Sequence, residues 1–267
     1  MALWYHAGRH WKEVSMARDS SNLKGILVCG GPSLNKIDTS QLTGSGKQVF
    51  AVNNTYPTVK PDVWIGMDKP DCYDGRIFDE PFIKILRGSY GKEKRQGRTL
   101  TSLSNLFYAD VEKCSKEELF LRRAHDCKFV WHENTMATAL HMMVWMGHKE
   151  IYIAGCDLDN SRKDYFNEVT LKDSHQKRNK RLYEQLFNYL KWFKSAAARK
   201  GIQVFSLSPD SKINTFLKYV ELEELNKDIE SSLGERGSLP YVLDVKEKSD
   251  KSSTKTILHS SNRWIRG

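Results

Sequence analysis

The sequence predicts an α/β protein with a mostly parallel sheet that is covered on both faces. Short apolar runs rich in β-branched and aromatic residues recur along the chain, and polar or helical stretches separate them. Continuous apolar runs of this length are typical of strands buried on both sides, as parallel strands are. The runs are GILVCGG (25–31), QVFAVNN (48–54), DVWIGMD (62–68), FIKILRGS (82–89), CKFVWH (127–132), EIYIAGCDL (150–158) and IQVFSLSP (202–209).

Two helices are predicted between these strands. In the segment 134–149, Asn134 or Thr135 can cap a helix with a core-facing methionine stripe, and His148 and Lys149 suit the negative end of its dipole. The second helix, over 176–200, ends at Gly201, which favours a helix stop. Its apolar stripe consists of Leu182, Leu186, Leu190, Phe193 and Ala197. We expect this stripe to pack on the sheet.

The chain divides into one main domain and two extensions. Its 267 residues are enough for a single large α/β domain. We place that domain at 24–225, after an N-terminal extension at 1–23 and before a polar, flexible tail at 226–267. Residues 88–105 are rich in Gly, Lys and Arg, which predicts a lid rather than a core element.

Charge and cysteine content narrow the compartment and the partners. The sequence shows neither a secretory signal nor an apolar stretch of membrane-spanning length, and its five cysteines are widely spaced without a zinc-ligand pattern. We therefore expect a cytoplasmic protein with free thiols. The net charge of +9 either predicts attraction to phosphate-rich partners, which include nucleotides, nucleic acid and an anionic membrane or lipo-oligosaccharide, or serves only solubility. Self-association is left open.

Three of the predicted strands end in small or polar residues. Gly30, Gly31 and Ser33 form a glycine turn after the first strand. The next two strands end in Asn53, Asn54 and Asp68. Because the carboxyl ends of parallel strands share one edge of a sheet, these residues are expected to lie where doubly wound folds bind nucleotides. Each residue alone is equally typical of a turn, and the glycine turn is neither a P-loop nor a GxGxxG motif.

Two further segments contain residues that can carry chemistry. Gly155, Asp157 and Asp159 follow a strand, and aspartates at this spacing either hold Mg²⁺ or Mn²⁺ at a nucleotide diphosphate or serve only a turn. His175, which the pattern places before the second helix and apart from its stripe, is either a general base or a surface histidine. The next positions, Lys177, Lys180 and Arg181, project away from the stripe and form either a solvated face or one that meets a polyanion.

Five segments, taken in order, resemble the bacterial lipo-oligosaccharide sialyltransferases and the related DUF115, or MptE-like, proteins. Together they cover about residues 24–225, and the most specific part is GHKEIYIAGCDL with the downstream DSH. The segments are GPSLNKID (31–38), VNNTY (52–56), GHKEIYIAGCDL (147–158), DSH (173–175) and SPDSKINTFLKYVEL (208–222).

The resemblance implies a Rossmann-like nucleotide-binding domain, of the variant GT-A type, with a lid. The sialyltransferases of this group transfer a sugar from a CMP-sugar donor to a glycan hydroxyl, use a histidine as general base and need no metal, and His175 matches that base. Tyr165 matches a tyrosine that stabilises the departing phosphate. Matches to the donor-nucleotide region are Gly30, Gly31, Ser33, Asn53, Thr135 and Gly155.

The chain departs from this pattern at three positions. Gly30 and Asp68 stand where the family has asparagines, and Asp159 stands where it has a second phosphate-binding tyrosine. Because an acid repels a phosphate, either Arg162 or the adjacent Lys163 faces the phosphate, or a divalent metal links Asp157 and Asp159 to a diphosphate donor.

Three functions follow from the sequence. The first is a glycosyltransferase acting on the hydroxyl of a glycan or of a hydroxymethylated DNA base. The second, from the MptE-like side of the resemblance, is a Mg²⁺-dependent pyrophosphokinase that uses ATP. The third is a nucleic-acid-binding protein without catalysis, ranked last because the aromatic residues do not alternate with basic ones on one face.

Overall fold

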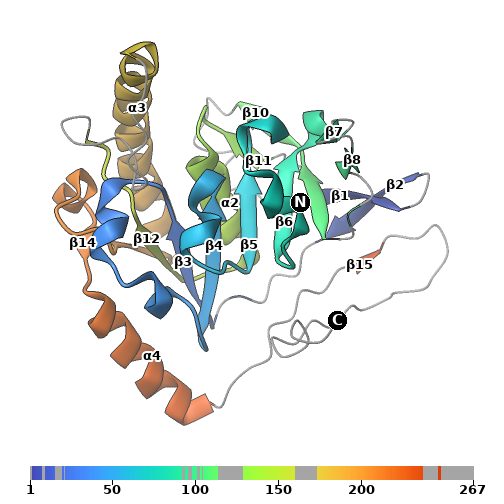
Figure 1. Cartoon of the computed structure of the whole chain (residues 1–267). Helices are drawn as coiled ribbons and strands as arrows, with labels where there is room; N and C mark the ends of the chain where they lie inside the picture. The colour runs from blue at the N-terminus through green and yellow to red at the C-terminus, as the bar shows by residue number, and fades with distance from the viewer. Residues whose placement is uncertain are drawn as a thin grey trace.

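A parallel sheet forms the centre of the protein (Figure 1). The computed structural model describes residues 2–7, 10–15, 20, 22–91, 94–95, 98–100, 103, 105–113, 129–159, 173–236 and 246–247. Neighbouring strands run parallel throughout the order β14-β13-β12-β3-β4-β5-β6-β9. These strands are β3 (Lys24–Val28), β4 (Lys47–Val52), β5 (Val63–Gly66), β6 (Ile83–Arg87), β9 (Leu106–Ala109), β12 (Glu150–Ala154), β13 (Gln203–Ser206) and β14 (Lys218–Tyr219). The predicted α/β class with a mostly parallel sheet is confirmed.

The sheet continues beyond β9 with antiparallel strands. β1 (Ala2–Ala7) pairs with β9 and with β2 (His10–Ser15), and β15 (Lys246–Glu247) pairs with β2. Residues from both ends of the chain therefore extend one edge of the sheet, while the division of the chain at residues 23 and 225 stays a prediction.

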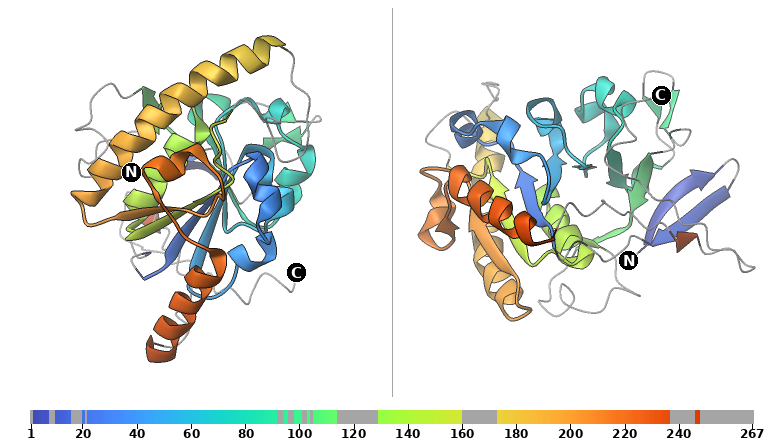
Figure 2. Two further views of the ribbon diagram at one scale, coloured as in Figure 1. Left: turned by 90° about the vertical axis from the view of Figure 1, so that its left-hand side faces the viewer. Right: turned by 90° about the horizontal axis from the view of Figure 1, so that it is seen from below.

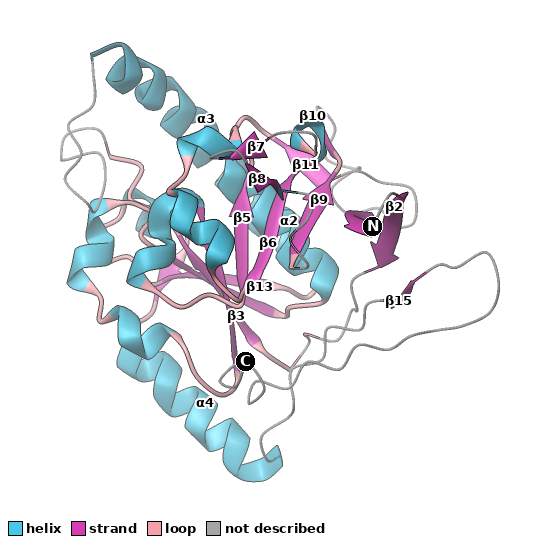
Figure 3. Ribbon diagram, turned by 45° about the vertical axis from the view of Figure 1, so that its right-hand side comes forward, coloured by secondary structure: helices cyan, strands magenta, loops and turns pink. Residues whose placement is uncertain are grey.

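Helices cover both faces of the sheet, as expected (Figures 2 and 3). Alternate residues of β3 point to opposite sides: Leu27 packs with the helices α2 (Thr135–Met146) and α3 (Asp173–Ala198), whereas Ile26 packs with α4 (Leu222–Arg236). The second face also carries most of the 3-10 turns. These turns are η1 (Pro32–Lys36), η2 (Thr39–Leu42), η3 (Asn53–Thr58), η4 (Pro70–Cys72), η5 (Gly75–Asp79), η6 (Gly88–Tyr90) and η8 (Lys212–Thr215).

Two features of the sheet differ from the sequence expectation. The run CKFVWH supplies β11 (Phe129–Trp131), which pairs with β10 (Val111–Lys113) in a separate parallel pair and not with the main sheet. Part of the predicted lid forms a small hairpin of β7 (Lys94–Arg95) and β8 (Arg98–Thr99), but Leu100 within that segment is fully buried in the core. The lid as a moving element stays a prediction.

Helix α2 begins at the predicted cap but ends at Met146, earlier than the sequence predicts. The Asn134 side chain accepts a hydrogen bond from the Met136 amide, and Gly147 ends the helix in the left-handed region at φ 98°. The expectation for His148 is wrong, because this side chain folds inward: it is fully buried, and its Nδ1 lies 3.1 Å from the Leu23 carbonyl oxygen. Burial lowers the pKa of His148 to about 4, so the ring is neutral and adds no charge at the helix end.

Acidification is expected to destabilise the protein through its buried histidines. Burial lowers the pKa of His141 to about 3 and that of His148 to about 4, so each binds a proton near pH 6.5 only when the chain unfolds. Asp62 acts in the opposite direction, because burial raises its pKa to about 6. The net loss in unfolding free energy between pH 7.5 and 5 is about 2 to 3 kcal/mol.

Urea unfolding at several pH values measures this loss. In the variant His148→Gln, the free energy of unfolding should change less steeply with pH than in the parent chain. The difference in slope should correspond to about one proton. A stability profile that stays flat from pH 7.5 to 5 would contradict the burial of neutral histidines.

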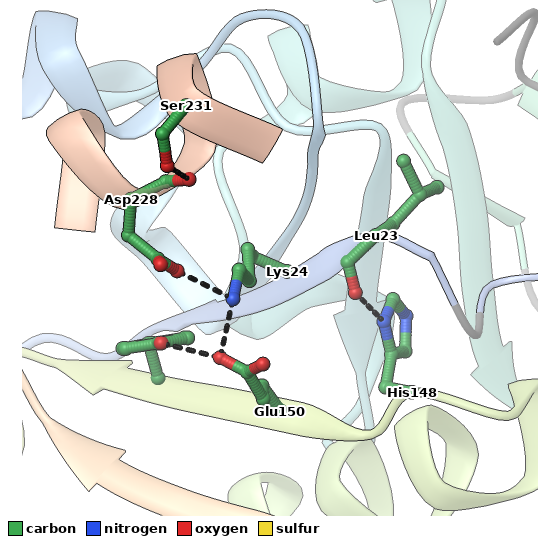
Figure 4. Close-up of polar contacts among 7 residues, drawn as sticks. Leu23, Lys24, His148, Glu150, Asp228 and Ser231 are labelled. Atoms are coloured by element: carbon green, nitrogen blue, oxygen red, sulfur yellow. Dashed lines mark hydrogen bonds and ion pairs between the residues drawn. The ribbon is translucent and has the colours of Figure 1, made fainter. Parts of the chain in front are cut away.

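Helix α4 is attached to the amino ends of two strands by an ionic cluster (Figure 4). Lys24 Nζ, at the start of β3, lies 2.6 Å from Glu150 Oε2 and 2.7 Å from Asp228 Oδ2 of α4. The Tyr152 hydroxyl donates a hydrogen bond to the same Glu150 oxygen. The residues 226–236, which the sequence assigned to a flexible tail, thus begin as the continuation of a packed helix.

Among the helices that the structure describes, none combines the length and the hydropathy that a bilayer-crossing segment requires.

Candidate active site

The strand order reverses between β3 and β12. The chain builds outward from β3 through β4, β5 and β6 on one side, and β12, β13 and β14 then follow on the other side. In open α/β sheets, ligands bind outside the carboxyl ends of the strands at such a reversal, because the following loops diverge to opposite faces. Two of the predicted segments, the glycine turn and the segment that begins at Gly155, follow these two strands directly.

The ends of β3 and β12 are in close backbone contact. The Gly31 amide donates a hydrogen bond to the Gly155 carbonyl oxygen at 2.7 Å. Gly155 has φ +68°, and a Cβ atom added there would lie 2.1 Å from the Cys29 carbonyl oxygen. Glycine is therefore required at 155 both by the backbone conformation and by the space available.

Asp157, which follows the neighbouring strand β12, contacts the glycine turn after β3. Its Oδ2 accepts a hydrogen bond from the Ser33 amide at 2.8 Å, and a Cβ atom added to Gly31 would lie 2.4 Å from this oxygen. A carboxylate suits the free amides at the start of η1. Within the described part of the chain, no group of three His, Cys, Asp or Glu side chains is placed to hold a metal ion. Metal binding by Asp157 and Asp159 stays a prediction.

Two buried polar atoms beside the turn make no hydrogen bond with any described residue. They are Ser33 Oγ and Asn53 Oδ1, which lie after the neighbouring strands β3 and β4. Asn53 also has φ +54°, in the left-handed region that asparagine adopts more readily than most residues with a side chain. A buried polar group left without a partner costs about 1 to 3 kcal/mol. A ligand that supplies hydrogen bonds to these atoms would recover that cost.

The other predicted donor-site residues lie at the same edge but differ in exposure. Gly30 is half-buried and Asn54 is exposed. Asp68 is exposed at the end of β5, where its amide donates a hydrogen bond to the Tyr73 hydroxyl. Thr135 is buried at the first residue of α2, and the Sγ atom of Cys156 lies 3.7 Å from the Sδ atom of the adjacent Met136. The positive end of α2 thus lies beneath the end of β12.

Two thiols at this edge, Cys29 and Cys156, are buried. Burial and, to a smaller extent, the nearby Asp157 charge together raise the pKa of Cys29 to about 12. Burial likewise raises the pKa of Cys156 well above its usual value. Both side chains therefore remain protonated at neutral pH, and a thiolate mechanism at either one is unsupported.

Helix α3 carries His175 past the carboxyl edge of the sheet. The helix ends near the start of β13, at the amino edge, and its 26 residues span about 39 Å, so its first half projects beyond the strands (Figure 1). The helix begins at Asp173, earlier than predicted, so His175 lies within its first turn. His175 is also in line with the buried stripe, because steps of four, three and four residues lead from it to Leu186. The prediction that it stands apart from the stripe is therefore wrong.

The remaining predicted residues lie on the outer side of α3, just after β12, or outside the described part of the chain. Lys177, Lys180 and Arg181 are exposed, as expected for residues that point away from the stripe. Asp159 is half-buried after β12. Arg162 and Tyr165 lie outside the described residues.

The sequence reasoning missed a loop that supports the site. After β13, Ser208 Oγ accepts a hydrogen bond from the Cys156 amide, and Ser211 Oγ donates one to the Cys156 carbonyl oxygen. The Lys212 amide donates a hydrogen bond to the Asp157 carbonyl oxygen at 3.2 Å. The segment SPDSK (208–212) is part of the resemblance described above, but its residue types are those of an ordinary turn.

Sialyltransferases are among the structural neighbours of this chain. The chain resembles the sialyltransferase CstII from Campylobacter jejuni in complex with cytidine-5'-monophosphate, at 13% identity over 90% of this chain and 95% of that chain, with a TM-score of 0.45. It also resembles the α-2,3-sialyltransferase Cst-I from Campylobacter jejuni, at 12% identity over 94% and 93%, with a TM-score of 0.45.

A further neighbour is the MAf glycosyltransferase from Magnetospirillum magneticum AMB-1. The identity is 12% over 86% of this chain and 39% of that chain, and the TM-score is 0.49. No protein-family model and no curated protein matches the chain. Membership in the DUF115 group thus stays a prediction. At these identities, the functional assignment depends on the residues of the site itself.

Proposed function

We propose that this protein is a glycosyltransferase that moves a sugar from a nucleotide-sugar donor to an acceptor hydroxyl. The observation that carries the proposal is the glycine turn at the strand-order reversal, where Ser33 Oγ and Asn53 Oδ1 are buried without hydrogen-bond partners among the described residues. A nucleoside offers several hydroxyl and amine groups that can satisfy such atoms. The donor would lie across the ends of β3, β4 and β12, above the positive end of α2.

The acceptor hydroxyl would be activated from α3. His175 takes the proton of this hydroxyl, the oxygen attacks the anomeric carbon of the donor sugar, and the nucleotide leaves with its phosphate. Tyr165 and Arg162 are the candidates to stabilise the negative charge that develops on this phosphate. The position of His175 supports this role, because it continues the inward face of α3 beyond the strand ends.

Diphosphate transfer from ATP is less well supported. It would use Mg²⁺ at Asp68, Asp157 and Asp159. Asp68 follows β5 and Asp157 follows β12, three strand spacings apart in the sheet, which corresponds to roughly 14 Å. One Mg²⁺ binds its ligands at about 2.1 Å, so these two carboxylates cannot share it in this arrangement.

Nucleotide binding is expected to stabilise the protein against heat. We would screen CMP-, UDP- and GDP-sugars and ATP, with and without Mg²⁺, by thermal unfolding. A ligand at about 100 times its Kd adds roughly 2.7 kcal/mol. The proposal fails if no nucleotide sugar raises the melting temperature.

The variant Ser33→Ala provides a specific control for the site. Because Ser33 Oγ has no partner among the described residues, its removal should leave the unliganded protein as stable as before or more stable. The same change should reduce the stabilisation by the nucleotide. Loss of stability without ligand would show that the hydroxyl serves the fold instead.

A further inference from the structure

The outward face of α3 carries a row of exposed cations. Lys177, Lys180 and Arg181 are exposed on the projecting half, and Lys191 and Lys194 continue the same side of the helix lower down. This side lies opposite the stripe that packs on the sheet. The row from 177 to 194 extends over about 25 Å. We call these residues, together with Lys212, the α3 ridge.

Two chain segments contribute to the lower part of the ridge. Phe187 of α3 and Phe216, which follows η8, pack edge to face with ring centroids 5.1 Å apart. The Nζ atoms of Lys191 and Lys212 lie 4.7 and 5.1 Å from the Phe187 centroid. Lys194 Nζ donates a hydrogen bond to the Phe216 carbonyl oxygen. These contacts hold three ammonium groups together on one surface.

The charges of the ridge are not neutralised within the described part of the chain. None of its six cations forms an ion pair with a described residue, and neither does Glu184, which lies between the two groups. Elsewhere Lys24, Lys36 and Lys218 do pair with carboxylates. Like charges three and four residues apart destabilise a helix. An external polyanion would relieve this repulsion.

We propose that the α3 ridge binds duplex DNA through its phosphates. An α-helix with its side chains is about 10 to 12 Å wide, and the major groove of B-DNA, about 12 Å wide, admits one. The first half of α3 projects from the body of the protein, so a duplex can approach it (Figure 2). The net charge of +9 provides the long-range attraction.

An anionic bilayer fits the ridge less well. Helices that lie in a membrane interface insert apolar side chains between the lipids. On this face the apolar rings of Phe187 and Phe216 are only partly exposed, and Lys191 lies within 5.9 Å of both ring centroids. The ridge therefore offers charge to a partner but little apolar surface.

The proposal has a consequence for the acceptor. His175 lies in the first turn of the same helix, on the side opposite the ridge, so a duplex whose major groove receives the projecting end of α3 would bring its base edges close to this residue. The acceptor would then be the hydroxyl of a hydroxymethylated DNA base, because unmodified duplex DNA has free hydroxyls only at its ends. This second part rests on the proposed transferase function, whereas DNA binding by the ridge does not.

The test measures DNA affinity as a function of salt. We would follow the anisotropy of a labelled duplex of about two helical turns, titrated with the full chain between about 50 and 200 mM NaCl. The triple variant Lys177→Ala, Lys180→Ala, Arg181→Ala should weaken binding at least about tenfold and lower the slope of log K against log salt by about 2 to 3. The triple variant Lys191→Ala, Lys194→Ala, Lys212→Ala should act similarly.

A matched control removes three exposed lysines away from the ridge. The variant Lys60→Ala, Lys149→Ala, Lys227→Ala changes the net charge equally and should keep a salt slope close to that of the parent chain. Equal losses in control and ridge variants would overturn the proposal, since binding would then follow net charge alone. Binding to vesicles of anionic lipid without binding to DNA would also overturn it.

The outcomes separate this proposal from the transferase proposal. If nucleotide sugars stabilise the protein but DNA does not bind, the ridge proposal fails and the transferase proposal stands. If DNA binds at the ridge but no nucleotide sugar stabilises the protein, the transferase proposal fails and the ridge proposal stands.

Discussion

Replacing His175 with asparagine is expected to lower the rate of sugar transfer by about 100- to 10,000-fold, the usual contribution of a general base. Asparagine keeps a polar side chain of similar reach but cannot take a proton at neutral pH. The donor would bind at the ends of β3, β4 and β12, apart from the first turn of α3, so nucleotide affinity should stay unchanged. Transfer is measured with the nucleotide sugar found in the thermal screen, with water as acceptor where no other is known.

The neighbouring Gln176 provides the control for this experiment. It occupies the next position of the same turn of α3, which lies about 100° away around the helix axis. Gln176→Ala should therefore retain transfer. Full activity in His175→Asn would refute the assignment of the base, and a loss of nucleotide binding in that variant would place His175 in the donor site.

Alanine at Gly155 is expected to cost more than about 4 kcal/mol of stability, a loss large enough to unfold many proteins. The new Cβ atom would lie 2.1 Å from the Cys29 carbonyl oxygen and 3.3 Å from the Leu34 Cβ. The first is a backbone atom just after β3 and the second belongs to a buried residue of η1, and neither is the far end of a flexible side chain. Urea unfolding measures the loss, or the chain fails to fold.

The variant Gly201→Ala distinguishes the cost of the backbone conformation from the cost of the steric contact. The φ of Gly201, +69°, matches that of Gly155, but a Cβ atom added there meets nothing within 4 Å. Gly201→Ala should therefore cost only the backbone term, about 1 to 2 kcal/mol. Similar losses in both variants would show that backbone conformation, and not contact between the ends of β3 and β12, sets the requirement for glycine.

The sequence predicted the strands whose signal is local and missed those that depend on pairing. β3 and β12 are continuous apolar runs, which only a sheet buried on both faces accommodates. β9 is a short run, LFYA, with half-buried Phe107, and its assignment comes from pairing with β6. The run CKFVWH has the composition of a core strand, but composition does not specify a partner strand.

For the candidate site, too, the sequence predicted the features that follow from local patterns and missed the contacts between distant residues. Strand-end residues such as Gly31 and Asn53 could be placed together because parallel strands share an edge. The bond between Asp157 and the Ser33 amide could not be predicted, because it joins a side chain to a backbone group 124 positions away. Ser208 and Ser211 are buried at the site although their composition indicates only a turn. His148 was misplaced because sequence position does not reveal the direction in which a side chain folds.

The closure of β3 against β12 also determines when the site can form during folding. β3 pairs with β4 soon after it in the chain, but its other neighbour begins at Glu150, 126 positions after Lys24. Pairings so far apart in sequence form slowly, because a long segment of chain loses conformational freedom before the contact is made. An intermediate with β3 to β6 assembled would have a glycine turn without Gly155 and Asp157 against it. Recovery of nucleotide binding during refolding would therefore report a late event.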